Sequence, residues 1–154
     1  MDVHNAHLPP RATRGVIKAH AFEAIRRRVD ADRGNPTILC GDFNAPWDEN
    51  GSGPLHWLRR DWGETLNARW VAAERGVIAN PDMRDILRDV HDPDKPFPVS
   101  HVTRSKSHRY DYIFATAELK TESCRYLTDW LERDGQNRRL SDHAPVEAVL
   151  SFRE

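Results

Sequence analysis

Apolar residues recur at helical spacing in two parts of the chain. From residue 15 to residue 33 they return every fourth position, at Ile17, Ala21, Ile25 and Val29. This period predicts an amphipathic helix, and Gly34 suits the position just past its end. From residue 82 to residue 91 the apolar positions again fit the helical template, and Asp82 is placed to cap the start of that helix. Residues 64–75 are also compatible with a helix.

Four other stretches have the pattern of β-strands. The first eight residues predict a short strand that Pro9 and Pro10 stop, because proline cannot donate to a β-ladder. The apolar run 36–40 predicts a buried strand, 109–116 alternates strong β formers, and 145–152 predicts a last strand. A helix that leads into a strand with a polar end is half of an α/β repeat, and such sheets place their sites at strand ends.

Two polar clusters lie next to predicted strands, and each has two interpretations. In "GDFNAPW" (41–47), Asp42 and Asn44 could simply close a turn, since both residue types bond their own backbone well. In "LSDHAPVEAVL", Ser141 and Asp142 read as turn residues, with His143 exposed. The alternative is that both clusters hold polar groups at a sheet edge for a chemical function.

Asp111 is harder to explain as a turn or surface residue. It stands within a predicted strand of aromatic and apolar residues, where an unpaired carboxylate would be expensive to bury. His143 lies beside a strand end and is a candidate partner. An Asp that fixes the tautomer of a His is a recurrent catalytic device, so we expect a hydrogen bond between these two side chains.

Two further stretches carry histidines. In "HNAH" (4–7), His4 and His7 face opposite sides of a strand and should not chelate one ion together, whereas Asn5 and His7 share a face. The stretch "HVTRSKSHR" (101–109) is either a solvated loop or a phosphate-contacting loop. Its basic residues are Arg104, Lys106 and Arg109, with His101 and His108.

Composition restricts the class of protein. The 154 residues are 38% hydrophobic and 31% charged, which predicts one globular domain spanning residues 1–154. A net charge of −1 gives no global case for nucleic-acid or membrane binding. The two cysteines are far apart in sequence, no apolar run reaches membrane-spanning length, and the start lacks the features of a signal peptide. We therefore expect a cytoplasmic protein without a membrane span.

The order of the polar motifs carries a resemblance to a known family. The successive motifs "NAHL" (5–8), "GDFN" (41–44), "RYDYIF" (109–114) and "SDH" (141–143) resemble signatures of the endonuclease/exonuclease/phosphatase superfamily. That group contains deoxyribonuclease-I-like nucleases, apurinic endonucleases, sphingomyelinases and inositol-phosphate phosphatases. The resemblance covers residues 3 to about 152, with residues 48–100 matching only in general character.

The resemblance implies a role for each matching residue. Asp42 would orient or deprotonate the attacking water and, with Asp142, hold a divalent cation, Mg²⁺ or Mn²⁺. Asn44 would contact phosphoryl oxygens. His143 would sit at the scissile phosphate and be oriented by Asp111. His7 would contact phosphate with Asn5 beside it, and His4 is the alternative to His7 if the strand register differs.

The resemblance also implies the fold. Complete members are four-layer α-β-β-α sandwiches, in which two packed mixed or antiparallel sheets are flanked by helices. The strand with an early Asn and the "QE"-like motif with a metal-ligand Glu have no match here. We therefore expect an α/β fold that is a partial sandwich, corresponding to the C-terminal portion of the domain without its N-terminal strands.

The leading functional hypothesis is a magnesium-dependent hydrolase of phosphodiesters or phosphomonoesters, with nucleic acid, phospholipid headgroups and inositol phosphates as candidate substrates. The alternative is a noncatalytic remnant that binds nucleic acid or another partner. Without the Glu ligand, we expect weak magnesium binding and low activity. Uncovered sheet surface would favour self-association.

Overall fold

The structure is a computed structural model of the chain. It describes residues 1–10, 15–32, 34–48, 53–54, 63–103, 107–132, 135–136 and 138–153. Within these ranges, none of the helices has both the length and the apolar character needed to cross a membrane.

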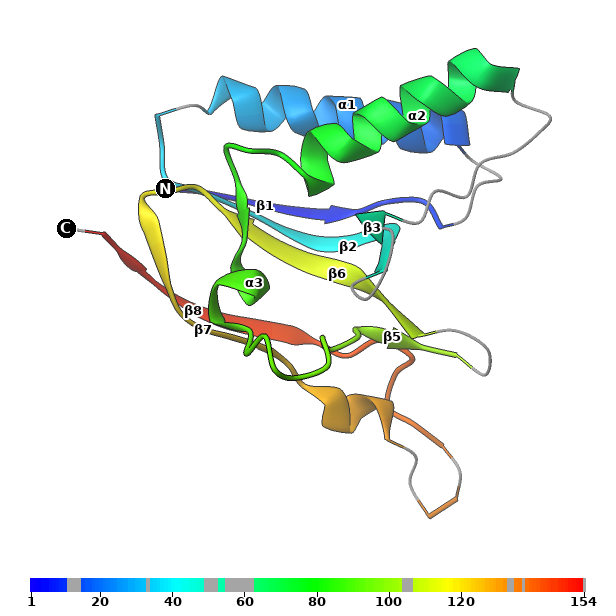
Figure 1. Cartoon of the computed structure of the whole chain (residues 1–154), viewed down its shortest axis with the longest axis vertical. Coiled ribbons are helices and arrows are strands. Elements are labelled where there is room, and N and C mark those ends of the chain that lie inside the picture. The colour runs from blue at the N-terminus through cyan, green and yellow to red at the C-terminus, as the bar shows by residue number, and fades with distance from the viewer. Residues whose placement is uncertain are drawn as a thin grey trace.

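Two β-sheets and a pair of long helices form three layers (Figure 1). The larger sheet has the strand order β1 (Asp2–His7), β2 (Thr37–Asp48), β6 (Ser107–Ala115), β4 (Arg84–Asp85). Short strands β3 (Gly53–Pro54) and β5 (His101–Val102) pair with β2 and β6, respectively. The second sheet consists of β7 (Leu119–Tyr126) and β8 (Val146–Phe152). The helices are α1 (Gly15–Ala31), α2 (Gly63–Ile78), α3 (Ile86–Val90) and the 3₁₀ helix η3 (Thr128–Leu131).

The two faces of the larger sheet have different neighbours. Leu39 and Phe114 belong to the main core, which includes Phe22 of α1 on the helical side. Ile38 and Ile113 point the other way and pack against the second sheet. The alternation follows from the period of two along a strand, and both faces of the central strands are therefore covered. These three layers confirm the α/β class and agree with a partial sandwich.

Most of the predicted elements are present, with differences at their ends. The helix expected over 15–33 is α1, and the helix-compatible stretch 64–75 lies within α2. The helix expected over 82–91 is shorter, because Arg84–Asp85 pairs with β6 and only Ile86–Val90 is helical. Asp82 is not its cap: Asp85 accepts the backbone N–H of Leu87 at 3.3 Å.

Two strands differ from the sequence expectation. β2 does not stop after Cys40 but continues to Asp48, with an irregular register against β6 between Asp42 and Trp47. Strand β7 was not predicted, because Leu119 and Tyr126 at its two ends are its only buried residues among the described ones. The extension of β2 and the strand β7 both form because they pair with a neighbouring strand. The local sequence pattern carries no information about that pairing.

Gly41 allows β1 and β2 to approach closely. It is the register partner of Ala6 and has a φ of +136°, a conformation that side chains disfavour. A Cβ at this position would lie 1.9 Å from the carbonyl oxygen of Ala6. Because that obstacle is backbone in a paired strand, a larger residue could be accommodated only by separating the two strands.

We expect Gly41→Ala to lower the free energy of unfolding by more than about 2 kcal/mol, because it combines a backbone clash with strain. Gly76→Ala in α2 is the matched control, since a Cβ there meets nothing within 4 Å. A helical glycine replaced by alanine should gain up to about 1 kcal/mol. Urea unfolding of the three proteins measures both effects, and a Gly41→Ala protein as stable as the wild type would contradict the close approach.

Candidate active site

Three polar side chains lie in one row across the larger sheet. His7 of β1 is the register partner of Asp42 in β2, and Asp42 is the partner of Asp111 in β6. Ile38 and Ile113 stand an even number of residues away on the same strands and face the second sheet. The row therefore lies on the face opposite the long helices.

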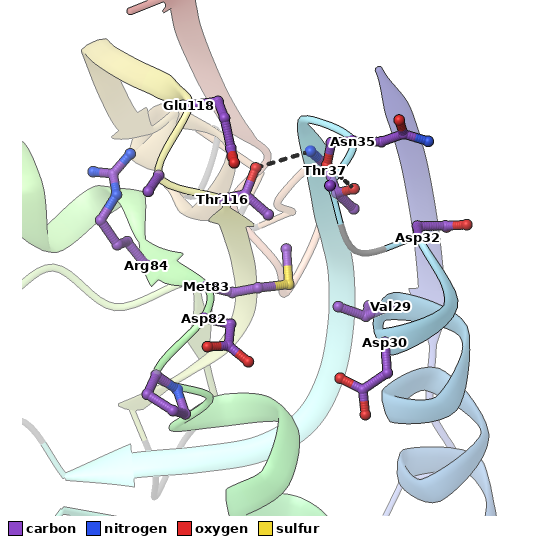
Figure 2. Close-up of a pocket in the computed structure, with 13 residues that line it drawn as sticks. Val29, Asp30, Asp32, Asn35, Thr37, Asp82, Met83, Arg84, Thr116 and Glu118 are labelled. Carbon is purple, nitrogen blue, oxygen red and sulfur yellow. Dashed lines mark hydrogen bonds between the residues drawn. The ribbon is translucent and has the colours of Figure 1, made fainter.

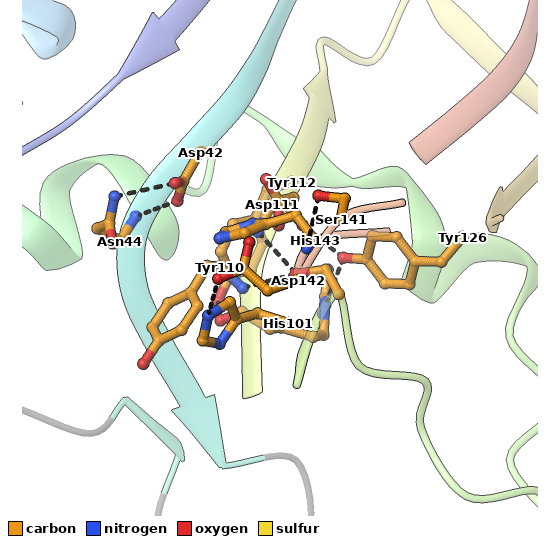
Figure 3. A network of polar contacts seen from close by, with 12 residues as sticks. Asp42, Asn44, His101, Tyr110, Asp111, Tyr112, Tyr126, Ser141, Asp142 and His143 are labelled. Carbon is orange, nitrogen blue, oxygen red and sulfur yellow. Dashed lines mark hydrogen bonds and ion pairs between the residues drawn. The ribbon is translucent and has the colours of Figure 1, made fainter. Parts of the chain in front are cut away.

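His143 reaches this row from the loop before β8 (Figure 3). Its Nδ1 lies 2.8 Å from Oδ2 of Asp111, so the hydrogen bond expected between these residues is present. The loop is fixed on both sides of the histidine. The backbone N–H of His143 donates to Oγ of Ser141 at 3.0 Å, and that of Ala144 donates to the carbonyl of Ser100 at 2.7 Å. Oγ of the buried Ser100 accepts the backbone N–H of Asp111, which ties the loop to β6.

Asn44 holds the carboxylate of Asp42 with two hydrogen bonds. Its backbone N–H donates to Oδ1 at 2.8 Å and its side-chain amide donates to Oδ2 at 2.9 Å. The same amide donates to the carbonyl of Leu8 at 3.0 Å. Asn44 has a φ of +48°, a left-handed conformation that asparagine tolerates better than most residues. The local turn thus fixes Asp42 within the row.

The charges in the row influence one another. Burial raises the pKa of the Asp42 carboxyl, and the Asp111 carboxylate raises it further, against the hydrogen bond from Asn44. The hydrogen bond to Asp111 raises the pKa of His143 and outweighs the opposing effect of burial. Positive charge at this end of the sheet is therefore favoured, either as a proton on His143 or as a bound cation.

The residues of β1 divide between its two faces. Nε2 of His7 lies 3.6 Å from Oδ2 of Asp42, and its side chain is 76% exposed at the end of the row. Asn5 is exposed on the same face, two residues earlier. His4 points to the other face and bonds Oδ2 of Asp32 at 2.8 Å. The alternative in which His4 takes the place of His7 is therefore wrong.

The two expected metal ligands, Asp42 and Asp142, belong to different groups of potential ligand atoms. One group contains Asp42, Asp111 and His143, and the other contains His101, Asp142 and His143; in each group the ligand atoms lie within 4.8 Å of one another. In the first group, burial raises the pKa of Asp42 and the neighbouring Asp111 carboxylate raises it further. This oxygen-rich donor set fits a hard divalent cation such as Mg²⁺.

The basic stretch 101–109 is described only in part, because Arg104 and Lys106 lie outside the described residues. Arg109 is 1% exposed and contributes to the interior rather than to a phosphate-binding surface. Its guanidinium lies 2.8 Å from Oδ2 of Asp85 and donates from Nε to the hydroxyl of Tyr126. The interpretation of Arg109 as a phosphate contact is therefore wrong.

Lys18 of α1 is a part of the site that sequence reasoning missed. Its side chain is 1% exposed, and Nζ donates to the carbonyl oxygen of Asn44. Burial lowers the pKa of Lys18 to about 8, while the carboxylates of Glu74 and Asp42 oppose that shift. Lys18 stands four residues before the buried Phe22, whereas Ile17 is 58% exposed. The predicted stripe is therefore wrong at Ile17, whereas Val29 is buried and Ala21 and Ile25 pack against the core as predicted. The spacing of four between Lys18 and Phe22 was the available signal.

A cavity of about 390 Å³ lies at the opposite end of β2 (Figure 2). Thr37 at the start of β2 and Thr116 after β6 line it, and the backbone N–H of Thr37 donates to Oγ1 of Thr116 at 3.0 Å. None of the predicted site residues lines this cavity. The cavity is therefore distinct from the place where the carboxylates and histidines converge.

The fold is of the α/β class, and carboxylates and histidines from β1, β2, β6 and the loop before β8 converge on one face of its larger sheet. A family model described as "Endonuclease/Exonuclease/phosphatase family" matches residues 4–143, and the chain belongs to this family. The resemblance found in the sequence motifs is thereby confirmed. A search of curated proteins finds no match.

Several solved structures share the fold. The catalytic domain of Xenopus laevis APE2 has a TM-score of 0.64 at 18% identity, covering 94% of this chain and 48% of that one. D. rerio TDP2 humanized by 14 mutations has a TM-score of 0.63 at 13% identity, covering 97% of this chain and 55% of that one. The mannosyl-6-phosphatase Bt3783 of Bacteroides thetaiotaomicron has a TM-score of 0.62 at 18% identity, covering 97% and 51%. This chain thus spans about half the length of the solved structures it matches.

We expect Asp111→Asn to lower the pKa of His143, because it removes the anion that raises it. A raised pKa means that the stabilisation by this pair is complete below 6.5, the ordinary value, and is lost as the pH rises through the folded-state pKa. Asp111→Asn should therefore destabilise the protein more at about pH 6 than at about pH 9. NMR titration of the imidazole and urea unfolding at both pH values are the measurements. The control is Asp92→Asn at the exposed Asp92, and equal losses at both pH values would count against the pair.

Lys18→Met should change how stability depends on pH. The folded-state pKa of Lys18 is about 8 and the ordinary value is 10.5, so between these values the unfolded chain binds more protons. The wild type should therefore gain stability over Lys18→Met as the pH rises through this window. Lys18→Met should also lose the bond to the Asn44 carbonyl, at a cost of about 1–3 kcal/mol at neutral pH if the acceptor stays unpaired. A stability difference that does not vary with pH would show that Lys18 is not held in the buried position.

Proposed function

We propose that this protein is a divalent-metal-dependent phosphoesterase that hydrolyses a phosphodiester or a phosphomonoester. The observation that carries the proposal is the row Asp42–Asp111 with His143 bonded to Asp111 at 2.8 Å. Hydrolysis of a phosphate ester needs a positioned water, compensation of the phosphoryl charge and stabilisation of the leaving oxygen. Membership of the family supports assigning these tasks to the residues of the row.

Each residue has a role that its surroundings suit. Asp42, held by two bonds from Asn44, orients the attacking water and accepts its proton. A protonated His143, favoured by Asp111, donates to the phosphoryl group or the leaving oxygen. Asn44 serves mainly to position Asp42, since its amide already donates to Asp42 and to Leu8; a contact to phosphate requires that amide to exchange partners.

His7 is placed at the outer end of the row. Its side chain is 76% exposed, with Nε2 3.6 Å from Oδ2 of Asp42. The imidazole can therefore contact a substrate phosphate without a change in its position. Asn5, exposed on the same face, extends the phosphate-contacting surface along β1. Together these residues would set the side from which a phosphate ester approaches.

Asp42 and Asp111 would hold Mg²⁺ or Mn²⁺. Asp142, the other ligand that the resemblance implies, lies in the second group of potential ligand atoms, with His101. The cation would supply Lewis-acid compensation of the negative charge on the phosphoryl oxygens. Both carboxylates next to His143 already accept hydrogen bonds within the protein, from Asn44 and from His143. We therefore expect magnesium binding in the millimolar range.

The solved structures of this fold do not select one substrate. One is named as a mannosyl-6-phosphatase, and another is a TDP2 complexed with a single-strand DNA product. Nucleic acid and a small phosphate ester both remain candidates. Self-association remains a further expectation, for which Val3, Val149 and Phe152 are exposed apolar candidates.

We expect the purified chain to hydrolyse bis(p-nitrophenyl) phosphate slowly in the presence of Mg²⁺ or Mn²⁺, and Asp42→Asn to reduce the rate at least about 100-fold. Asp42→Asn preserves the size of the side chain and removes its charge. Asp92→Asn at an exposed position is the control and should keep the wild-type rate. If the folded wild type shows no metal-dependent turnover above that of Asp42→Asn, the catalytic proposal fails. The noncatalytic binding module is then favoured, and plasmid DNA binding at several salt concentrations tests it.

A further inference from the structure

His143 belongs to two different groups of potential metal ligands. On one side it is bonded to Asp111, next to Asp42, which makes an oxygen-rich environment. The second group joins it to His101 and Asp142, so that two of the three donors are imidazoles. The donor chemistry of the second group differs from that of a magnesium site, because Mg²⁺ prefers oxygen ligands and zinc readily accepts imidazole nitrogen.

The backbone fixes His101 beside His143. The two residues form an isolated β-bridge, and their ring centroids are 4.5 Å apart. Nε2 of His101 lies 3.6 Å from Oδ2 of Asp142. Two ligand atoms at about 2.0–2.1 Å from a tetrahedral zinc ion are about 3.4 Å apart, so this pair is already close to the separation that zinc requires. Asp142 is 63% exposed and can adjust its side chain to complete the set.

The remaining bonding of both imidazoles suits metal binding. Nδ1 of His143 is engaged by Asp111, which leaves Nε2 as the nitrogen available to an ion. A metal-ligating histidine commonly donates its other N–H to a carboxylate in this way, which fixes the ring and increases its basicity. In the described part of the chain, the buried Nδ1 atom of His101 has no hydrogen-bond partner. The ring packs against Tyr110 and His143, with Nε2 toward Asp142.

We propose that His101, Asp142 and His143 form a binding site for a zinc-type cation, separate from the magnesium set of Asp42 and Asp111, and that zinc bound there inhibits the enzyme. The site offers two nitrogens and one carboxylate, leaving an open position for water, as is usual for zinc with three protein ligands. Inhibition follows because Nε2 of His143 cannot both bind zinc and act on a phosphate group. The binding half stands on the ligand geometry, whereas the inhibitory half rests on the proposed phosphoesterase function.

The binding half is tested with Co²⁺, which takes zinc sites and reports its coordination by visible d–d absorption. The purified chain should give the intense spectrum of a four- or five-coordinate Co²⁺, Zn²⁺ should abolish it, and excess Mg²⁺ should not. His101→Phe keeps a ring against Tyr110 and removes both nitrogens, so Co²⁺ affinity should fall at least about 100-fold, since even outer partners of a metal site change affinity by about 10–100-fold. Asp142→Asn should weaken Co²⁺ binding as well. His20→Asn changes an exposed histidine of α1 and should leave the affinity unchanged.

The outcomes separate this proposal from the proposed function. Loss of Co²⁺ binding in His101→Phe, with folding verified by urea unfolding, supports the site, and an unchanged Co²⁺ affinity in that variant overturns it. The magnesium-dependent turnover of the wild type should be inhibited by Zn²⁺ at the concentration that displaces Co²⁺, and that of His101→Phe should resist it. Zinc that binds through His101 without inhibiting, or that supports turnover, overturns the inhibitory half. Absence of any magnesium-dependent turnover refutes the proposed function and leaves the Co²⁺ result to stand alone.

Discussion

The antiparallel pairing of β2 with β6 places two carboxylates, Asp42 and Asp111, directly opposite each other. Like charges at opposed positions of a sheet repel and would normally destabilise the pairing. Here each carboxylate has its own donors: Asn44 bonds both oxygens of Asp42, and His143 bonds Asp111. The site can be understood as the set of contacts that makes this pair of anions tolerable at the end of a half-buried sheet.

This requirement connects elements that are distant in the sequence. The left-handed Asn44 turns its amide back toward Asp42, and Lys18 of α1 holds the carbonyl of that same residue. Lys18 in turn is buried near Glu74 of α2, whose carboxylate accepts the indole N–H of Trp70. The helical layer thus contributes a positive charge beneath the row, from the face of the sheet opposite the row. Burial of that lysine is unfavourable by itself, which is consistent with its lowered pKa of about 8.

The sequence predicts those parts of the structure that depend on local pattern. The periodicity of 15–33 and the alternation of 109–116 give α1 and β6 with small errors at their ends. The local sequence pattern predicts the wrong structure where pairing with a distant segment determines it. β2 continues past Cys40 because the register against β6 resumes at Trp47, and Asp85 rather than Asp82 caps α3 because residues 84–85 pair with β6.

The same distinction applies to the site. The sequence motifs indicate Asp42, Asp111 and His143 as candidate site residues. The contact between Asp111 and His143 could be expected because a carboxylate within a strand needs a partner. His7 rather than His4 joins the row because β1 pairs in parallel with β2 in one particular register. Lys18 was missed because a lysine on an amphipathic helix ordinarily faces solvent, and only the two helices packed together show it to be buried.

The position of His143 between two donor sets has a physical consequence for selectivity. Toward Asp111 and Asp42 the surroundings are anionic and favour the imidazolium, as the raised pKa of His143 indicates. Burial and the charge of His143 both lower the pKa of His101, so the neighbouring ring favours the neutral form. A neutral imidazole is a metal ligand and an imidazolium is not. Under the two proposals, the charged form of His143 would serve proton transfer and its neutral form would serve metal ligation, so the ion bound near the ring would select between them.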